Sequence, residues 1–150
     1  HGCVLAAEDH RILSTGCNGF PRGMKNDDSL PVTRPDKYPW MIHGEQNAIA
    51  NANGPIIGAT AYITGKPCLS CLIHFWQNGV KTVVYQHGVG WSFTESEVGI
   101  INQFLEQSGM VMTSYEPDLS WLVDMVLDDP KLSAILVERG YHKSNTEKDL

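Results

Sequence analysis

The sequence predicts an α/β fold in which helices pack on one mixed β-sheet. After an opening pair of strand-like runs, helix-favouring and strand-favouring segments alternate along the chain, as in α/β sandwiches. The chain has 150 residues, of which 42% are hydrophobic. That length suffices for one core but not for two full domains, so we predict a single domain over residues 1–150.

Two short apolar runs at the start predict a β-hairpin. Residues 3–7 and 12–17 suit strands, and the polar stretch between them suits a turn. Residues 18–39 are rich in Gly, Pro, Asn and Asp and show no apolar periodicity, so we expect a long functional loop. The chain starts at His1 without an initiator Met, and we expect residues before it to be missing.

Helices and strands alternate through the middle of the chain. Two segments favour helices, each closed by an Asn-Gly pair, and each is followed by a strand-favouring segment. In order, these segments are helix 43–53, strand 59–64, helix 69–77 and strand 80–85.

A capping box predicts where the next helix begins. Thr94 is followed three residues later by Glu97, and Gly109 is a suitable stop. Residues 110–115 then suit a last strand. The apolar residues at helical spacing should face inward: Val98, Ile101, Phe104 and Leu105.

Residues 117–150 predict a helical, acidic C-terminal extension. Asp118 could cap a helix that stops near Pro130, with a weaker helical turn over residues 132–137. We expect the polar residues 141–150 to fray. The apolar positions of the first helix are Leu119, Leu122, Val123 and Val126.

The charge distribution argues against long nucleic acid as a partner. The formal net charge is -6, from 11 Lys+Arg and 17 Asp+Glu, whereas proteins that coat DNA or RNA are basic. Residues 90–150 carry all the excess acidity, and residues 1–89 are nearly neutral, so a single nucleotide remains a suitable ligand. We see neither a signal peptide nor a membrane-spanning run and expect a cytoplasmic protein.

Two short motifs carry the chemistry: His43-Gly44-Glu45 and Pro67-Cys68-Leu69-Ser70-Cys71. One imidazole and two thiolates supply three zinc ligands and leave a fourth position free for water, as a catalytic site requires. Glu45, two residues after His43, can lie beside the metal without binding it and transfer protons. The alternatives are a redox Cys-x-x-Cys pair and a closed structural site that His74 completes.

The pattern H-x-E…P-C-x-x-C is the signature of zinc nucleobase deaminases, and the chain resembles the cytidine/deoxycytidylate deaminase superfamily. A narrower resemblance to deoxycytidylate (dCMP) deaminases, including those of bacteriophages, rests on three segments, strongest within residues 1–90. It implies a cytidine-deaminase-like three-layer α/β/α sandwich with a mixed central sheet and a helix before the first strand. The segments are the G-x-N-G-x-P-x-G stretch of residues 16–23, Lys37-Tyr38-Pro39 and Glu45-Gln46-Asn47-Ala48-Ile49.

The resemblance implies hydrolysis of dCMP to dUMP and ammonia, a step toward dTTP. His43, Cys68 and Cys71 would hold one Zn²⁺, and Glu45 would be the proton shuttle that protonates N3 of cytosine. Four residues would contact the substrate. They are Asn18 at the sugar hydroxyl, the Gly44 N–H at the base carbonyl, the Pro67 carbonyl at the departing amine, and His87 facing the phosphate.

The resemblance also implies an allosteric nucleotide site in a homohexamer, where dCTP with Mg²⁺ activates and dTTP inhibits. If the protein is viral, it would act in the host cytoplasm. The basic side chains of the loop over residues 18–39, Lys37 included, could bind phosphates or be ordinary solvated charges. Asp27 and Asp28 could hold Mg²⁺ or cap a turn, and Asn18 could be a turn residue. The residues assigned to the allosteric site are Gly16, Gly19, Arg22, Lys25 and Arg34.

Other interpretations stay open. The zinc motif alone also suits deaminases of tRNA adenosine, free cytosine, a pyrimidine precursor or dCTP, and a structural zinc module is a further alternative. Trp91 and Phe93 could stack on a base or pack in the core. We expect Cys3 and Cys17 to be free thiols rather than a disulfide.

Overall fold

The computed structural model describes residues 1–24, 30–88 and 92–118. The chain divides into two compact units, His1–Tyr115 and Glu116–Leu150, and the architecture below is that of the first. The helices expected after Asp118 lie outside the described residues, and the single domain over residues 1–150 stays a prediction. No helix within the described ranges has the length and apolarity needed to cross a membrane.

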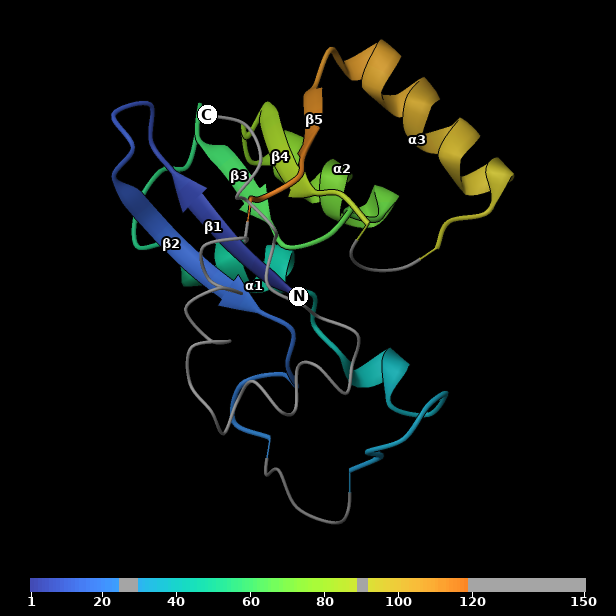
Figure 1. Ribbon diagram of the computed structural model, residues 1–150. Helices are drawn as coiled ribbons and strands as arrows, with labels where there is room; N and C mark the ends of the chain where they lie inside the picture. Colours follow the sequence, from blue (N-terminus) through green and yellow to red (C-terminus); the bar gives the residue numbers. More distant parts are fainter. Residues whose placement is uncertain (25–29, 89–91, 119–150) are drawn as a thin grey trace, which may run out of the picture. The chain divides into compact units, whose positions relative to one another are not determined.

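A mixed five-stranded sheet forms the centre of the first unit (Figure 1). Strand β1 pairs antiparallel with β2 on one side and with β3 on the other, whereas β3, β4 and β5 run parallel. The expected hairpin and the mixed sheet are therefore confirmed. In spatial order the strands are β2 (Ile12–Cys17), β1 (Gly2–Ala6), β3 (Thr60–Ile63), β4 (Thr82–Gln86) and β5 (Val111–Tyr115).

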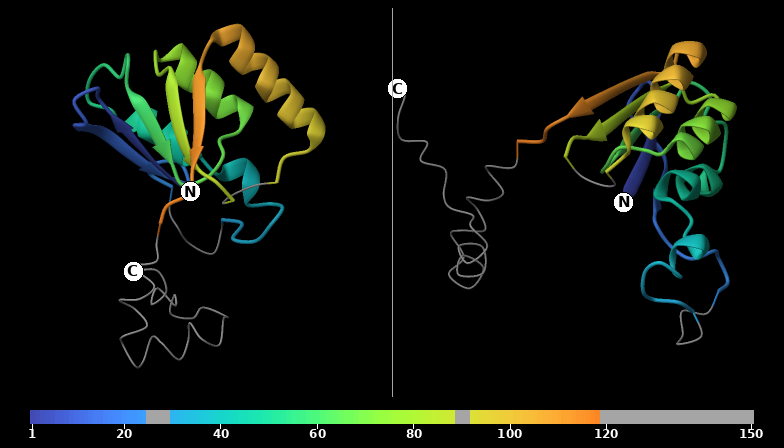
Figure 2. Two further views of the ribbon diagram at one scale, coloured as in Figure 1. Left: turned by 45° about the horizontal axis from the view of Figure 1, so that its top comes forward. Right: turned by 90° about the vertical axis from the view of Figure 1, so that its right-hand side faces the viewer.

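Three α-helices lie on the same face of this sheet, as Figure 2 shows. Right-handed crossovers between parallel strands place α2 and α3 on one face, and α2 also contacts α1. These helices and the mixed sheet confirm the cytidine-deaminase-like α/β fold expected from the sequence. The helices are α1 (Gly44–Asn51), α2 (Leu69–Gln77) and α3 (Glu95–Ser108), and a short 3₁₀ helix, η1 (Tyr38–Trp40), precedes α1.

The hydrophobic core lies between the helices and the sheet. Central strands contribute Leu5, Ala61 and Val83, and α2 contributes Phe75, all with no measurable exposure. The period-2 alternation of β1 and β3 directs these strand residues toward the helical layer. Of the four residues expected to face inward from α3, Ile101 is fully buried and the other three are half-buried.

Helix α1 packs directly on strand β2. A Cβ atom at Gly16 would overlap the Gly44 carbonyl oxygen and the Ala48 backbone nitrogen, so only glycine allows this approach. The side-chain amides of Asn47 and Asn51 donate to carbonyls of the edge strand β2, at 2.8 and 2.7 Å. The middle and the end of α1 are thereby held against β2.

Candidate metal centre and its cavity

The candidate site lies where β2 and β3 end. Gly2 pairs with Cys17 and Cys3 pairs with Ile63, so the carboxyl ends of β2 and β3 meet at one edge of the sheet. The chain then leads from β2 through the long loop to α1, and from β3 through a short loop to α2. Ligand sites of α/β proteins commonly form at such an edge.

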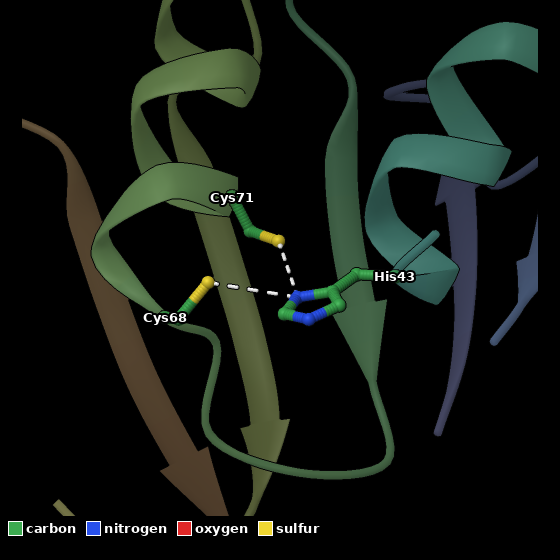
Figure 3. Close-up of side chains that lie close together, drawn as sticks. All are labelled: His43, Cys68 and Cys71. Atoms are coloured by element: carbon green, nitrogen blue, oxygen red, sulfur yellow. Dashed lines mark hydrogen bonds between the residues drawn. The ribbon is translucent and has the colours of Figure 1, made fainter. Parts of the chain in front are cut away.

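His43, Cys68 and Cys71 come together at the beginning of two helices. His43 is the N-cap residue of α1, Cys68 is the N-cap residue of α2, and Cys71 lies in the first turn of α2. Their ligand atoms all lie within 4.8 Å of one another. Figure 3 shows the His43 Nδ1 atom facing both sulfur atoms, 3.3 Å from that of Cys71 and 3.6 Å from that of Cys68.

The chemistry of these donors fits zinc. One imidazole and two thiols are ligands that Zn²⁺ prefers, and three protein ligands leave a fourth tetrahedral position free. A hydrogen bond from Cys71 lowers the pKa of the Cys68 thiol to about 5. The pKa of Cys71 is raised by that hydrogen bond, by burial and by the charge of Glu45. The hydrogen bond between the two sulfur atoms therefore favours the thiolate form at Cys68.

Glu45 is a buried carboxylic acid beside this cluster. It is only 5% exposed. Burial is the larger cause that raises the pKa of the Cys3 thiol, and the charge of Glu45 is the second cause. Its position two residues after His43 places it in the first turn of α1, next to the cluster but outside the ligand group. A carboxylate in this position can exchange protons with a group bound near the cluster.

A cavity of about 920 Å³ adjoins the cluster. It is large enough to accept a nucleotide-sized ligand. Its wall combines His43 and Cys68 of the cluster with residues of the long loop and of the segment that precedes α3. The charged and aromatic lining residues are Arg34, Lys37, Tyr38, His43, Glu45, Lys66, Phe93 and Glu97, together with Asn18 and Cys68.

Asn18 and Gly44, both assigned to the substrate by the sequence, are hydrogen-bonded to each other. The Gly44 N–H donates to Asn18 Oδ1 at 2.7 Å, and the Asn18 N–H donates to the His1 carbonyl at 3.1 Å. A base carbonyl that approaches the Gly44 N–H must share this donor or displace the Asn18 side chain.

The other residues assigned to the substrate differ in their placement. Pro67 is fully buried beside Cys68. His87 is exposed after β4, and its backbone N–H donates to the Tyr115 carbonyl. His87 is not among the residues that line the cavity described above.

The five residues assigned to an allosteric site lie in different parts of the structure. Arg34 lines the cavity beside the metal cluster, whereas Gly16 lies under α1. The Arg22 guanidinium donates to the side chain of Asn51, at the end of α1. Gly19 forms an isolated bridge with Ile42, and Lys25 lies outside the described residues.

Sequence reasoning did not single out Lys66. It lies directly before Pro67 and Cys68, and it lines the cavity. A lysine adjoining a predicted metal-ligand motif was the available signal. The sequence leaves the role of its neighbour Phe93 open between base stacking and core packing.

The His/Cys/Cys cluster on a mixed α/β sheet is the kind of donor set that would hold a zinc ion through three side chains. The family model for the "cytidine and deoxycytidylate deaminase zinc-binding region" matches residues 1–87. The chain therefore belongs to the cytidine and deoxycytidylate deaminase family, whose members are hydrolytic deaminases.

Individual relatives point to one branch of this family. The chain is 28% identical over 130 residues to a deoxycytidylate deaminase of Pongo abelii, covering 81% of this chain and 71% of that relative. It is 34% identical over 91 residues to the human deoxycytidylate deaminase, covering 56% of this chain and about half of that relative, 51%. A crystal structure of the dCMP deaminase of cyanophage S-TIM5 in complex with dCMP and dUMP has a TM-score of 0.57 and 26% identity, covering 76% of this chain and 79% of that one.

Proposed function

We propose that this chain hydrolyses dCMP to dUMP and ammonia, with Zn²⁺ held by His43, Cys68 and Cys71. The observation that carries the proposal is the buried carboxyl group of Glu45 beside the cluster, in the wall of the same cavity. A structural zinc site needs no acid or base next to it, whereas hydrolysis does. The relatives named deoxycytidylate deaminase support dCMP as the substrate.

Glu45 would move the protons of the reaction. A zinc ion held there would act as a Lewis acid, which makes water nucleophilic near neutral pH. The Glu45 carboxylate would accept a proton from the attacking water and pass it to N3 of the cytosine ring. The C4–O bond would form first, which gives a tetrahedral C4 with N3 protonated. Glu45 would then carry the proton of the new C4 hydroxyl group to the amino group, so that the C4–N bond breaks, ammonia leaves and the C4 carbonyl of uracil remains.

The remaining polar groups would orient the substrate. The Gly44 N–H would bind the base carbonyl, the Asn18 side chain would bind the sugar hydroxyl, and the Pro67 carbonyl would accept from the departing amine. The hydrogen bond between Gly44 and Asn18 supports a shared role for these two groups, since one ligand can contact both. His87 does not line the cavity, so it would meet the phosphate only if the bound nucleotide extended beyond the cavity.

The test is the pair of variants Glu45→Gln and Glu45→Ala. We expect both to bind one zinc per chain and to fold, while kcat for dCMP falls by a factor of about 10² to 10⁴, since the acid/base group is lost. Zinc content, circular dichroism and dUMP formation measure the three properties. Unchanged turnover in Glu45→Gln would refute the role of Glu45. If the wild-type protein converts another amine substrate but not dCMP, the assignment of dCMP as the substrate is refuted.

We further propose allosteric control, with dCTP and Mg²⁺ activating and dTTP inhibiting, in a cytoplasmic homohexamer. The G-x-N-G-x-P-x-G segment supports this proposal through its resemblance to dCMP deaminases. Rates of dCMP turnover with each effector, and sedimentation with and without dCTP, test it. Identical rates in the presence and absence of both effectors would exclude the regulation.

A further inference from the structure

Three cations in the cavity wall each lie over an aromatic ring. The Arg34 guanidinium lies 5.0 Å from the centre of the Tyr38 ring, and the Lys37 ammonium lies 6.0 Å from that of Phe20. The Lys66 ammonium lies 5.6 Å from the centre of the Phe93 ring. These distances are within the range of cation–π attraction, which restricts the position of each charge without neutralising it.

Among the described residues, no carboxylate forms an ion pair with these three groups. Over the described ranges, the one ion pair within 4.0 Å joins Arg11 to Asp9, at the β1–β2 turn. The carboxylates in the cavity wall are otherwise engaged: Glu45 is buried beside the metal cluster, and Glu97 accepts hydrogen bonds from Thr94 at the start of α3. The cavity therefore presents fixed positive charge to a ligand.

Lys66 is the cation whose backbone is tied most directly to the metal centre. Only Pro67 separates it from the ligand Cys68, and Pro67 is fully buried, which leaves little freedom to this segment. Phe93, which positions the ammonium group, packs against the hydrophobic core. Lys66 is half-buried as a whole residue, and its ammonium group is held over the Phe93 ring in the cavity wall.

We propose that Lys66 is a specificity-determining residue that binds the phosphate of the nucleotide substrate, with Phe93 as its positioning residue. This inference rests on the proposed function. Charge-assisted hydrogen bonds from an ammonium group to phosphate oxygens are strong, and Arg34 and Lys37 add to the attraction from the long loop. The chain should therefore discriminate a nucleotide from the corresponding nucleoside through Lys66.

Lys66→Met is the decisive variant because it removes the charge and keeps the apolar stem over Phe93. The matched control is Lys81→Met: the Lys81 ammonium also lies over an aromatic ring, 5.5 Å from the centre of Trp76, but Lys81 is not among the residues that line this cavity. Lys66→Arg restores the charge. Kinetics with dCMP and deoxycytidine, and calorimetry with dUMP and deoxyuridine, compare ligands with and without the phosphate.

We expect Lys66→Met to raise KM for dCMP and Kd for dUMP about tenfold or more. Deoxyuridine binding and the midpoint of thermal unfolding should stay unchanged. Lys66→Arg should recover most of the preference for the phosphate, and Lys81→Met should behave as wild type.

Equal losses for dUMP and deoxyuridine, or unchanged dUMP binding, would overturn the proposal. The proposed function fails separately, if zinc-loaded wild type does not turn over dCMP. A preference for dUMP over deoxyuridine that Lys66→Met abolishes would still establish the phosphate subsite in that case.

Discussion

The Asn18 side chain holds the first N–H of the helix that carries Glu45, since Asn18 Oδ1 accepts from the Gly44 N–H at 2.7 Å. Asn18 follows directly on β2, and Gly44 directly follows the metal-ligand candidate His43. One hydrogen bond therefore links the end of an edge strand to the beginning of the helix at the site. It also satisfies one of the free N–H groups at a helix N-terminus.

Replacing Asn18 with Ala should weaken both stability and activity. Loss of a side-chain acceptor at a helix start costs about 0.5–2 kcal/mol, measurable as a shift of the denaturant midpoint. Asn18→Asp keeps the acceptor but loses the amide donor. We therefore expect this variant to be more stable than Asn18→Ala, while its KM for dCMP stays higher than that of the wild type. Wild-type stability in Asn18→Ala would contradict the linking role.

Gly16→Ala should prevent α1 from packing on β2. The added Cβ would overlap backbone atoms of Gly44 and Ala48, and backbone cannot yield as a flexible side chain can. We expect a loss of at least about 3 kcal/mol, the upper range for overpacking, together with lower zinc content. Gly19→Ala is the matched control, since nothing lies within 4 Å of a Cβ atom there. Equal effects of the two variants would exclude the packing explanation.

Removal of zinc should abolish turnover reversibly. We expect a chelator to stop dUMP formation and to lower the unfolding midpoint, because the cluster joins the starts of α1 and α2. Added Zn²⁺, but not Mg²⁺, should restore both properties, since imidazole and thiolate ligands suit zinc. Cys71→Ser should contain little zinc. Full activity of this variant without bound metal would refute the assignment.

Stability should fall at alkaline pH because of Cys3. Burial, then the charge of Glu45, raises the pKa of this thiol from 9.0 to about 12 in the folded chain. The unfolded chain loses the Cys3 proton above about pH 9, whereas the folded chain keeps it. This group therefore contributes stability below pH 9 that is lost as the pH rises toward 12, with a slope of up to about 1.4 kcal/mol per pH unit.

The comparison that isolates Cys3 is between Cys3→Ala and Cys17→Ala. Cys17 is also a free thiol but is exposed. Unfolding free energies measured between pH 8 and 11 should fall less steeply in Cys3→Ala than in wild type. Cys17→Ala should keep the wild-type slope, and the same slope in all three proteins would refute the prediction.

Sequence alone determined the features that depend on near neighbours in the chain. The capping box of Thr94 and Glu97 and the helix end at Gly109 were both predicted correctly, and the structure shows that Gly109 is left-handed, with φ 72°. The two metal-ligand motifs were placed correctly at helix starts for the same reason, since a cap or a Cys-x-x-Cys pair depends on residues three or four positions apart. Helix ends were less accurate: the helix expected over residues 43–53 spans Gly44–Asn51.

Tertiary structure decided which residues share the cavity. Arg34, assigned from the sequence to a separate nucleotide site, lines the cavity of the metal centre, and Lys66 lies there over Phe93. Gly16 proved to be the contact surface for α1. The Lys66–Phe93 and Gly16–Gly44 contacts join residues 27 and 28 positions apart, which strand pairing and helix packing bring together. No local pattern encodes such distances, because the energy that sets them comes from burying the faces of several elements in one core.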